Sequence, residues 1–277
     1  MPRIGIMQGR LVPPTDNRIQ CFPRDNWKLE FELAKKVKFD CIEWIFDLHG
    51  ADVNPLANDN GINEMRSLSS EYSIQILSVC ASYFIDKPLV RASASELKDR
   101  LGILEWLLYR CKLFGMNRIV LPFVDASRIE SDAELDSVCK TLEHALLYAE
   151  KTGVVINLET SLTPDRFAIL LSRLSHPMIK VNYDSGNSSS LGYKPKDEFD
   201  SYGVRVGSIH IKDRQFGGST VALGTGSANF PELFKCLEKV HYSGDFILEA
   251  ARGNSGDEVN WTQRNRSFIL KYLQKIY

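Results

Sequence analysis

The sequence predicts an α/β protein, a (β/α)8 TIM barrel that forms one domain over residues 1–277. Eight short segments rich in Ile, Val and Leu recur along the whole chain, and segments with helical periodicity lie between them. The length suits that fold. A doubly wound open sheet is the main alternative, but it needs fewer strands, and no GxGxxG motif follows the first apolar segment.

The predicted strands share a length of five to seven residues and a high content of β-branched side chains. Their apolar character on both faces is typical of a parallel sheet that is covered by helices. In chain order, the predicted strands are 3–7, 40–44, 74–80, 118–122, 154–159, 178–184, 206–212 and 245–250.

The predicted helices carry residues that favour helix starts and ends. Either Ser131 or Asp132 is suited to an N-cap, as is Asn229. Pro164 suits a first turn, and Gly115 and Gly153 suit positions just past a helix end. In chain order, the predicted helical segments are 26–39, 94–115, 131–153, 163–176, 230–244 and 262–277.

The composition excludes some partners and leaves others open. With 44% hydrophobic and 25% charged residues and a net charge of −1, the chain has no overall field to attract nucleic acid or anionic membrane. No apolar run is long enough to span a bilayer, and the N-terminus reads as a strand. We therefore expect a cytoplasmic protein that binds a small molecule. The oligomeric state stays open, with a homo-oligomer as one option.

The cysteines lack the spacing of a metal finger or a redox motif. We expect buried, reduced thiols, as is usual in a cytosolic protein. They are Cys21, Cys41, Cys80, Cys111, Cys139 and Cys236.

Ionisable residues follow the last four predicted strands at their carboxyl ends, where barrels of this kind carry their chemistry. One face of each strand is apolar, and the other face presents Glu159, Asp184, His210 or Glu249. Three carboxylates that converge need compensation, because like charges raise one another's pKa. Taken singly, each residue has a plainer explanation. Asp184 in "DSGN" suits a turn or a helix N-cap, for example, and a histidine in an apolar strand usually lies in the core.

The coincidence of four such residues on adjacent strands favours one divalent metal ion. Three carboxylates and an imidazole suit Mn²⁺, Mg²⁺ or Co²⁺, and Zn²⁺ is a further option. We expect His210 to lie at the open mouth of the barrel and not in the packed layers below it.

The segments "GIMQGRL", "IEWIFD", "INLET", "NYDSGN", "IHIKDR" and "FILEA" resemble, in this order and spacing, the xylose isomerase-like TIM-barrel superfamily and its sugar-phosphate isomerases and epimerases. The resemblance implies a metal held by Glu159, Asp184, His210 and Glu249, with Glu159 and Glu249 also acting as the acid–base pair. Many ketose epimerases of this group have a histidine three residues after the metal aspartate, where this chain has Asn187.

The implied chemistry is proton transfer next to a carbonyl through an enediolate, as in a metal-dependent isomerase or epimerase of a sugar or sugar phosphate. A dehydratase of a keto-cyclitol or polyol acid on the same scaffold is the alternative, and a carbohydrate-binding protein without turnover is the third reading. Residues expected to contact the substrate at the mouth are Arg10, Glu43, Asn187, Lys212, Arg214 and Arg252.

The glycine-rich segment 217–230 follows the seventh predicted strand. It is interpreted either as a flexible lid or as a phosphate-binding loop, because loops at this place often bind phosphate through backbone N–H groups.

Overall fold

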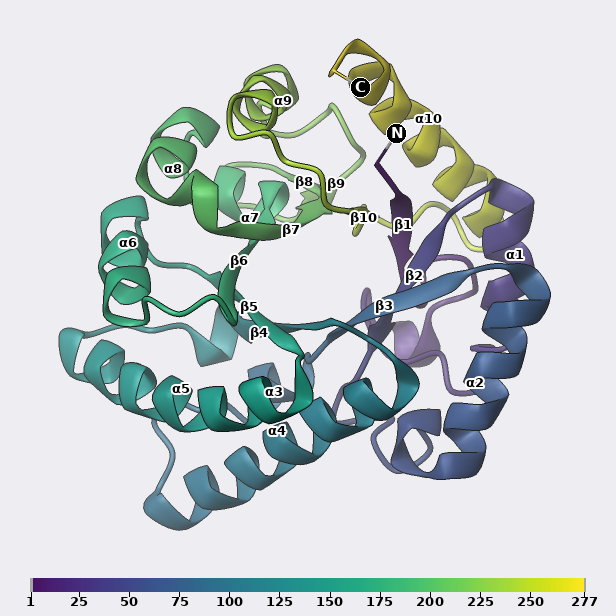
Figure 1. The fold of residues 1–277 in the computed structure, drawn as a ribbon. Coiled ribbons are helices and arrows are strands. Elements are labelled where there is room, and N and C mark those ends of the chain that lie inside the picture. Colours follow the sequence, from purple (N-terminus) through teal and green to yellow (C-terminus); the bar gives the residue numbers. More distant parts are fainter. Residues whose placement is uncertain (1, 277) are drawn as a thin grey trace.

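The computed structural model describes residues 2–276, and within them eight parallel strands close into a barrel in the order β1-β10-β7-β6-β5-β4-β3-β2. Figure 1 looks along this barrel, with the helices forming a ring outside the strands. The predicted fold class is therefore confirmed. The barrel strands are β1 (Ile4–Met7), β2 (Cys41–Ile45), β3 (Gln75–Cys80), β4 (Arg118–Phe123), β5 (Val155–Thr160), β6 (Ile179–Asp184), β7 (Val206–Ile211) and β10 (Phe246–Leu248).

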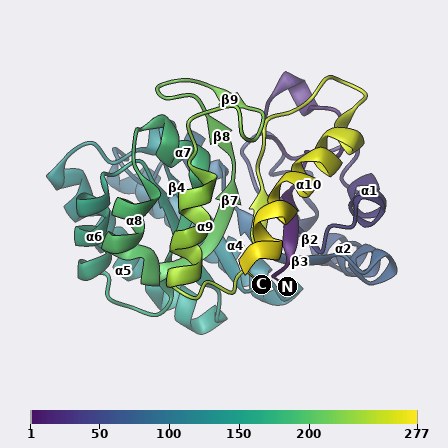
Figure 2. The ribbon, with the colours of Figure 1, turned by 90° about the horizontal axis from the view of Figure 1, so that it is seen from above.

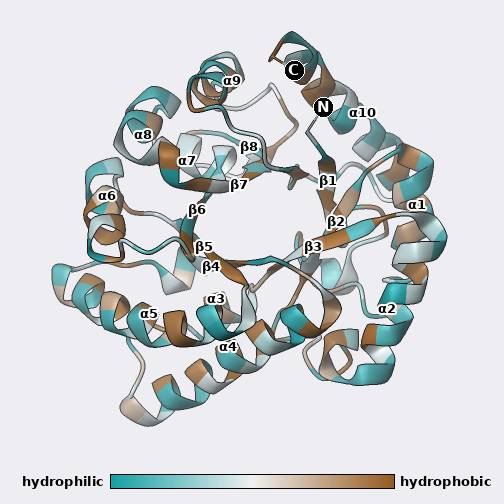
Figure 3. Cartoon of the chain, viewed as in Figure 1, coloured by the Kyte–Doolittle hydropathy of each residue, from teal (hydrophilic) through white to brown (hydrophobic). Residues whose placement is uncertain are grey.

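The helices of the outer ring bury apolar side chains in a core shared with the strands. The colours of Figure 3 show hydrophobic and hydrophilic residues alternating along these helices. The helices are α1 (Leu29–Val37), α2 (Asp59–Tyr72), α3 (Tyr83–Asp86), α4 (Ala94–Phe114), α5 (Asp132–Thr152), α6 (Pro164–Arg173), α7 (Ser185–Ser190), α8 (Pro195–Tyr202), α9 (Phe230–Lys239) and α10 (Glu258–Ile276). Short 3₁₀ helices span Thr15–Asn17, Pro55–Ala57, Asp125–Ser127 and Gly203–Arg205.

The predicted helical segments do not include α2 or α8, and the reason lies in the composition of these two helices. Over its length α2 buries only Ile62 and Met65, too few to produce a visible apolar stripe. Its start is set instead by Asn58, whose side chain accepts a hydrogen bond from the N–H of Gly61. Helix α8 begins at Pro195 and buries a carboxylate, that of Glu198, beside its aromatic residues.

The two ends of the barrel differ in chemistry. At the amino ends of the strands, Arg118 and Asp245 form a buried ion pair of 2.7 Å, and Asp245 also binds Arg3 at 2.6 Å. At the carboxyl ends, a small antiparallel hairpin of β8 (Asp213–Arg214) and β9 (Thr220–Val221) rises beyond the barrel. Figure 2 shows this hairpin at the end opposite the N-terminus. The cavity lined by ionisable residues lies at the carboxyl ends of the strands, on the side of this hairpin.

All six cysteines are buried and unpaired with one another, as expected for thiols within the core. In residues 2–276, no helix combines the length and apolar character that crossing a bilayer requires.

Candidate metal and active site

The candidate site is a cavity of about 340 Å³ at the carboxyl ends of the strands, a size suited to a small sugar. Glu159 lines it from the end of β5 and Glu249 from the residue after β10. Asn187, Lys212 and Arg214 complete one wall from α7 and the chain after β7. Polar side chains that sequence analysis places on separate strands thus meet in one hollow.

The four predicted metal ligands lie together, and two of them, Glu159 and Glu249, line this cavity directly. Ligand atoms of Glu159, Asp184 and His210 all lie within 4.8 Å of one another. The fourth residue, Glu249, brings Oε2 to 2.9 Å from Nδ1 of His210, while Oε2 of Glu159 lies 3.4 Å from the same nitrogen. The inward parity of four adjacent strands is what produces this convergence.

His210 lies deeper than expected. Its side chain has no exposed surface and does not line the cavity, so it lies beneath the open mouth and not at it. Nε2 is hydrogen-bonded to Oε1 of Glu43 at 2.5 Å, and Nδ1 faces the carboxylates without a hydrogen bond to any described residue. Burial disfavours the charged imidazole, but Glu43, with Glu159 and Glu249, raises the pKa of His210 well above its ordinary value.

The two carboxylate oxygens of Asp184 contact different groups. Oδ1 accepts hydrogen bonds of 2.8 Å from the N–H groups of Gly186 and Asn187 and so caps the start of α7. Oδ2 lies 3.4 Å from Nζ of Lys212, a residue that lines the cavity. The helix N-cap interpretation of "DSGN" is therefore confirmed, and the role of Asp184 as a metal ligand stays a prediction. Gly186 is required here because a Cβ atom would lie 2.6 Å from Cγ of Lys212.

Two amide side chains, those of Asn182 and Asn187, hold Glu159 in place. No role for Asn182 is predicted from the sequence. Asn182 donates to Oε2 at 2.8 Å, and Asn187 donates to Oε1 at 2.7 Å. Asn182 is itself held by Ser208, which donates to Oδ1 at 2.6 Å. The signal for both missed residues is their inward parity, which Asn182 shares with Asp184 and Ser208 shares with His210. The carboxylate of Glu159 is thus fixed before any ligand binds.

Lys212 places a positive charge among the carboxylates. Nζ lies 2.6 Å from Oε1 of Glu249. Burial raises the pKa of Asp184 to about 6, although the positive charge of Lys212 acts to lower it. Burial also acts to raise the pKa of Glu249. The combined effect of Lys212 and His210 is larger and holds the pKa of Glu249 well below its usual range.

The residues present fit a divalent cation. The donor set is three carboxylates and one imidazole, which suits Mn²⁺, Mg²⁺ or Co²⁺. Nδ1 of His210 is buried among these carboxylates and forms no hydrogen bond within the described chain, as expected for an atom that binds metal. These two observations make Glu159, Asp184, His210 and Glu249 a candidate metal centre.

Two residues expected to contact the substrate lie elsewhere. Glu43 is fully buried against His210 and Ser78, so its carboxylate is not available to a sugar. Arg252 donates to the backbone carbonyls of Gly9 and Val12 and braces the loop after β1, outside the residues that line the cavity. In both cases tertiary contacts, invisible in the sequence, use up the polar groups.

Arg10 and Arg214 do line the cavity, although their guanidinium groups are already engaged. Arg10 donates to the carbonyl of Ala250 and to Oε1 of Gln20, each at 3.0 Å. Arg214 donates at 3.0 Å to Oδ1 of Asn187 and so links that residue to the β8–β9 hairpin. Asn187 and Arg214, each expected to contact the substrate, are thus hydrogen-bonded to one another, and Asn187 is also bonded to Glu159.

The glycine-rich segment 217–230 is not arranged to bind phosphate. The carboxylate of Asp213 accepts hydrogen bonds from the N–H groups of Gly224 and Gly226 at 2.9 Å and of Ala228 at 3.0 Å. An internal carboxylate therefore occupies the backbone donors that a phosphate would need. The phosphate-binding interpretation of these amides is wrong.

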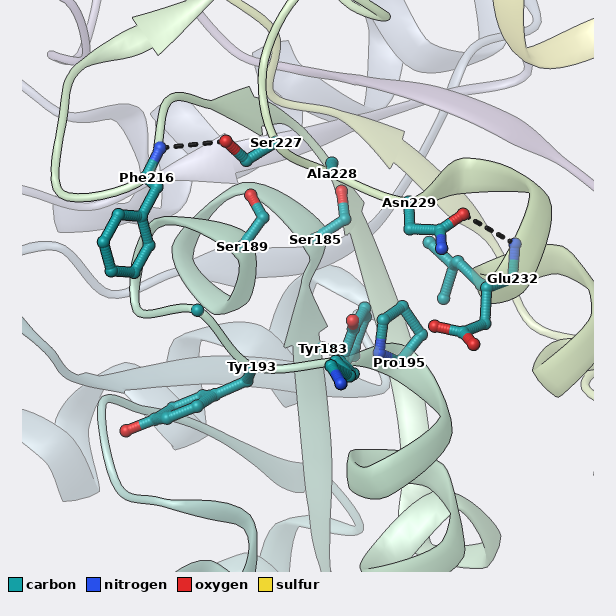
Figure 4. A pocket seen from close by; sticks show the side chains of 13 residues that line it. Tyr183, Ser185, Ser189, Tyr193, Pro195, Phe216, Ser227, Ala228, Asn229 and Glu232 are labelled. Atoms are coloured by element: carbon teal, nitrogen blue, oxygen red, sulfur yellow. Dashed lines mark hydrogen bonds between the residues drawn. The ribbon is translucent and has the colours of Figure 1, made fainter.

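A second cavity, of about 470 Å³, lies beside the mouth between α7, α8 and α9 (Figure 4). No candidate metal ligand lines it. Ser227 accepts a hydrogen bond from the N–H of Phe216, and Asn229 accepts one from the N–H of Glu232. This cavity is larger than the mouth but lacks its ionisable cluster, so the mouth remains the candidate active site.

Comparison with known proteins places the fold in context. Residues 31–272 match the family described as xylose isomerase-like TIM barrel. The curated protein "Putative L-ribulose-5-phosphate 3-epimerase SgbU" of Haemophilus influenzae is 24% identical over 267 residues, which cover 90% of this chain and 88% of that protein.

Two solved structures share the barrel over nearly the full length of both chains. One is the IOLI protein with a binding zinc atom, at a TM-score of 0.80 and 15% identity, covering 99% of each chain. The other is L-ribulose 3-epimerase, at a TM-score of 0.76 and 16% identity, covering 100% of this chain and 96% of that one. At these identities the likeness establishes the fold.

Proposed function

The chain belongs to the xylose isomerase-like TIM-barrel family, and from that premise we propose that it is a divalent-metal-dependent epimerase of a ketose or ketose phosphate. The reaction is proton transfer at the carbon next to the carbonyl. Glu159 and Glu249 act as the acid–base pair, and Asp184 and His210 serve as ligands that complete the metal site.

The observation that carries the proposal is the placement of the two glutamates. In the barrel, β10 is the neighbour of β7 on one side, and β6 followed by β5 lies on the other. Glu249 and Glu159 therefore come from strands on opposite sides of β7, and their Oε2 atoms lie 2.9 and 3.4 Å from Nδ1 of His210. A sugar bound above His210 has one carboxylate on each face, which is what removal of a proton from one face and its return to the other require.

The residues around the candidate metal centre have separate tasks in this scheme. A divalent cation, when bound by the four ligands, supplies polarisation of the substrate carbonyl and stabilises the negative charge that develops beside it. Asn182 and Asn187 orient the carboxylate of Glu159. Lys212 lies at the cavity wall and is suited to donate a hydrogen bond to a substrate oxygen.

The substrate class is supported by the relatives and by the rim of the cavity. SgbU is named for a ketopentose phosphate, and one structural neighbour is named for a free ketopentose. The rim carries Arg18, whose guanidinium forms no hydrogen bond or ion pair with another described residue. An uncommitted guanidinium at this place favours a sugar with a phosphate at its far end.

The proposal is tested by NMR in D₂O with a panel of ketoses and ketose 5-phosphates and with Mn²⁺ or Mg²⁺ present. An epimerase incorporates deuterium next to the carbonyl and interconverts two epimers without loss of water. Loss of water identifies the dehydratase alternative. Tight binding of a sugar without exchange or turnover identifies a carbohydrate-binding protein, and either of these results contradicts the proposed function.

A further inference from the structure

Behind His210, two hydrogen bonds lead from β7 across the interior of the barrel to β2 and β3. Nε2 of His210 is hydrogen-bonded to Oε1 of Glu43 at 2.5 Å, and Oγ of Ser78 donates to Oε2 of Glu43 at 2.6 Å. The three side chains are at most 1% exposed. Water therefore does not compete for these groups, and the orientation of the His210 imidazole depends on contacts within the protein alone.

The contact leaves one nitrogen of His210 for a ligand. An imidazole binds a metal through the nitrogen that carries no proton, and a hydrogen bond at the other nitrogen decides which one that is. Because Nε2 is taken by Glu43, Nδ1 is the atom turned toward Glu159 and Glu249. Nδ1 has no hydrogen-bond partner in the described chain.

The burial of Glu43 also needs an explanation. A carboxylate without exposed surface is destabilising unless it is paired and hydrogen-bonded. Within the described chain, His210 is the single basic side chain that forms an ion pair with Glu43 at 4.0 Å or less. An apolar residue at position 43 would fill the interior at lower cost, so the carboxylate is explained by what it does to His210.

We infer that Glu43, steadied by Ser78, is a positioning residue that fixes the imidazole of His210 with Nδ1 toward the divalent cation. The inference rests on the proposed function, because it presupposes a cation held by the four ligands. Glu43 acts through His210 and does not touch the substrate, so its removal changes metal binding before it changes chemistry.

The first measurement is Mn²⁺ affinity by electron paramagnetic resonance of the free ion, on metal-stripped protein. Replacement of an outer carboxylate of this kind lowers metal affinity by about 10- to 100-fold, and we expect that loss for Glu43→Gln. Ser78→Ala keeps the carboxylate and removes only its second hydrogen bond, so a loss near the low end, about tenfold, is expected.

Glu198→Gln is the matched control, since Glu198 is equally buried and hydroxyl-bonded but contacts none of the four ligands. Its Mn²⁺ affinity should equal that of the wild type. Circular dichroism of each metal-free variant establishes that it is folded. If Glu43→Gln does not fold, Ser78→Ala decides the matter, and wild-type affinity in that variant overturns the inference.

The second measurement separates orientation from general stability. Long-range ¹H–¹⁵N correlation spectra of the Zn²⁺-loaded, ¹⁵N-labelled protein report which ring nitrogen carries the proton, and the chain has only five histidines. We expect Nε2 of His210 to carry it, with a resonance that moves upfield in Glu43→Gln because a neutral amide accepts more weakly. A proton on Nδ1 with the metal on Nε2, or an Nε2–H resonance unchanged in Glu43→Gln, overturns the inference.

The outcomes also separate the inference from the proposed function. If the wild type binds Mn²⁺ and Glu43→Gln binds it with the same affinity, only the role of Glu43 is contradicted. Weakened binding in Glu43→Gln, combined with no epimerase activity in the wild type, supports the inference and contradicts only the proposed reaction. Wild-type protein that binds no Mn²⁺ contradicts both.

Discussion

The ammonium of Lys212 lies 2.6 Å from Oε1 of Glu249 and 3.4 Å from Oδ2 of Asp184. A cation that belongs to the chain itself thus contacts two of the four candidate metal ligands. Burial of several carboxylates is destabilising without compensation, and Lys212 supplies part of that compensation. Lys212 therefore neutralises carboxylates that a divalent cation, once bound by the candidate ligands, would also contact.

Replacement of Lys212 by Met should make the protein more dependent on metal. The metal-free variant should be destabilised by a few kcal/mol, about the penalty for removing one partner of a buried ion pair. Added Mn²⁺ should then raise the melting temperature more in Lys212→Met than in the wild type, as differential scanning calorimetry measures. The exposed Lys180 on β6 offers the control, since Lys180→Met should leave the shift unchanged. An equal or smaller shift in Lys212→Met contradicts this role.

Arg18 should discriminate between phosphorylated and free sugars. A charge-assisted hydrogen bond to phosphate contributes about 1.5–3 kcal/mol, so Arg18→Ala should raise KM for a ketose phosphate roughly 10- to 100-fold. KM for the corresponding free ketose should stay the same, as should kcat for both. Arg24→Ala is the control, because Arg24 is already paired with Asp16 at 2.7 Å. If KM rises equally for both sugars, Arg18 supports the loop and does not bind phosphate.

Much of the fold follows from the sequence, because buried parallel strands leave a local signal. The observed β4 begins at Arg118, as predicted, and the other barrel strands begin within one residue of the predicted starts. The inward parity of Glu159, Asp184, His210 and Glu249 follows from the same alternation. Both features depend on neighbouring residues alone, which is why a single sequence carries them.

The contacts that cross the barrel could not be predicted in the same way. Glu43 and His210 are 167 residues apart, and their hydrogen bond depends on how the strands tilt and stagger when the barrel closes. Likewise, Asp213 binds amides 11 to 15 residues further on, so the glycine-rich segment reads as a phosphate loop until its internal partner is seen. Local patterns do not report where a loop finds its hydrogen bonds.

Glu198 should make the stability of the barrel fall as the pH rises. Burial, only partly offset by hydroxyl donors from Ser188, Tyr202 and Tyr183, raises the pKa of this carboxyl from 4.5 to about 7. Between these values the folded state holds a proton that the unfolded state has released, so stability decreases across that window and the loss is complete above pH 7.

Glu198→Gln removes this titration. The free energy of unfolding of Glu198→Gln relative to the wild type should therefore increase between pH 5 and pH 8, by on the order of 2–3 kcal/mol at most. Urea denaturation at each pH measures the difference, and the exposed Glu238 on α9 supplies the control substitution Glu238→Gln. A pH-independent difference between Glu198→Gln and the wild type contradicts a raised pKa.

The glutamate pair provides the decisive test of the chemistry. Glu159→Gln and Glu249→Gln each keep the size of the side chain and one oxygen ligand but remove a base. Loss of general acid–base catalysis lowers turnover by about 10²- to 10⁴-fold, and that fall should persist at saturating Mn²⁺. A defect of metal binding alone is instead relieved by excess Mn²⁺. Deuterium incorporation next to the carbonyl, measured by NMR, isolates the proton-transfer step.

The two variants should differ in which epimer they fail to label. If each glutamate serves one face of the sugar, Glu159→Gln loses exchange from one epimer and Glu249→Gln from the other, while overall epimerisation stops in both. Both variants exchanging at the wild-type rate would mean that the pair does not carry the chemistry. Lys212 then becomes the candidate base, because it lines the same cavity, whereas Glu43 is buried against His210 and has no exposed surface.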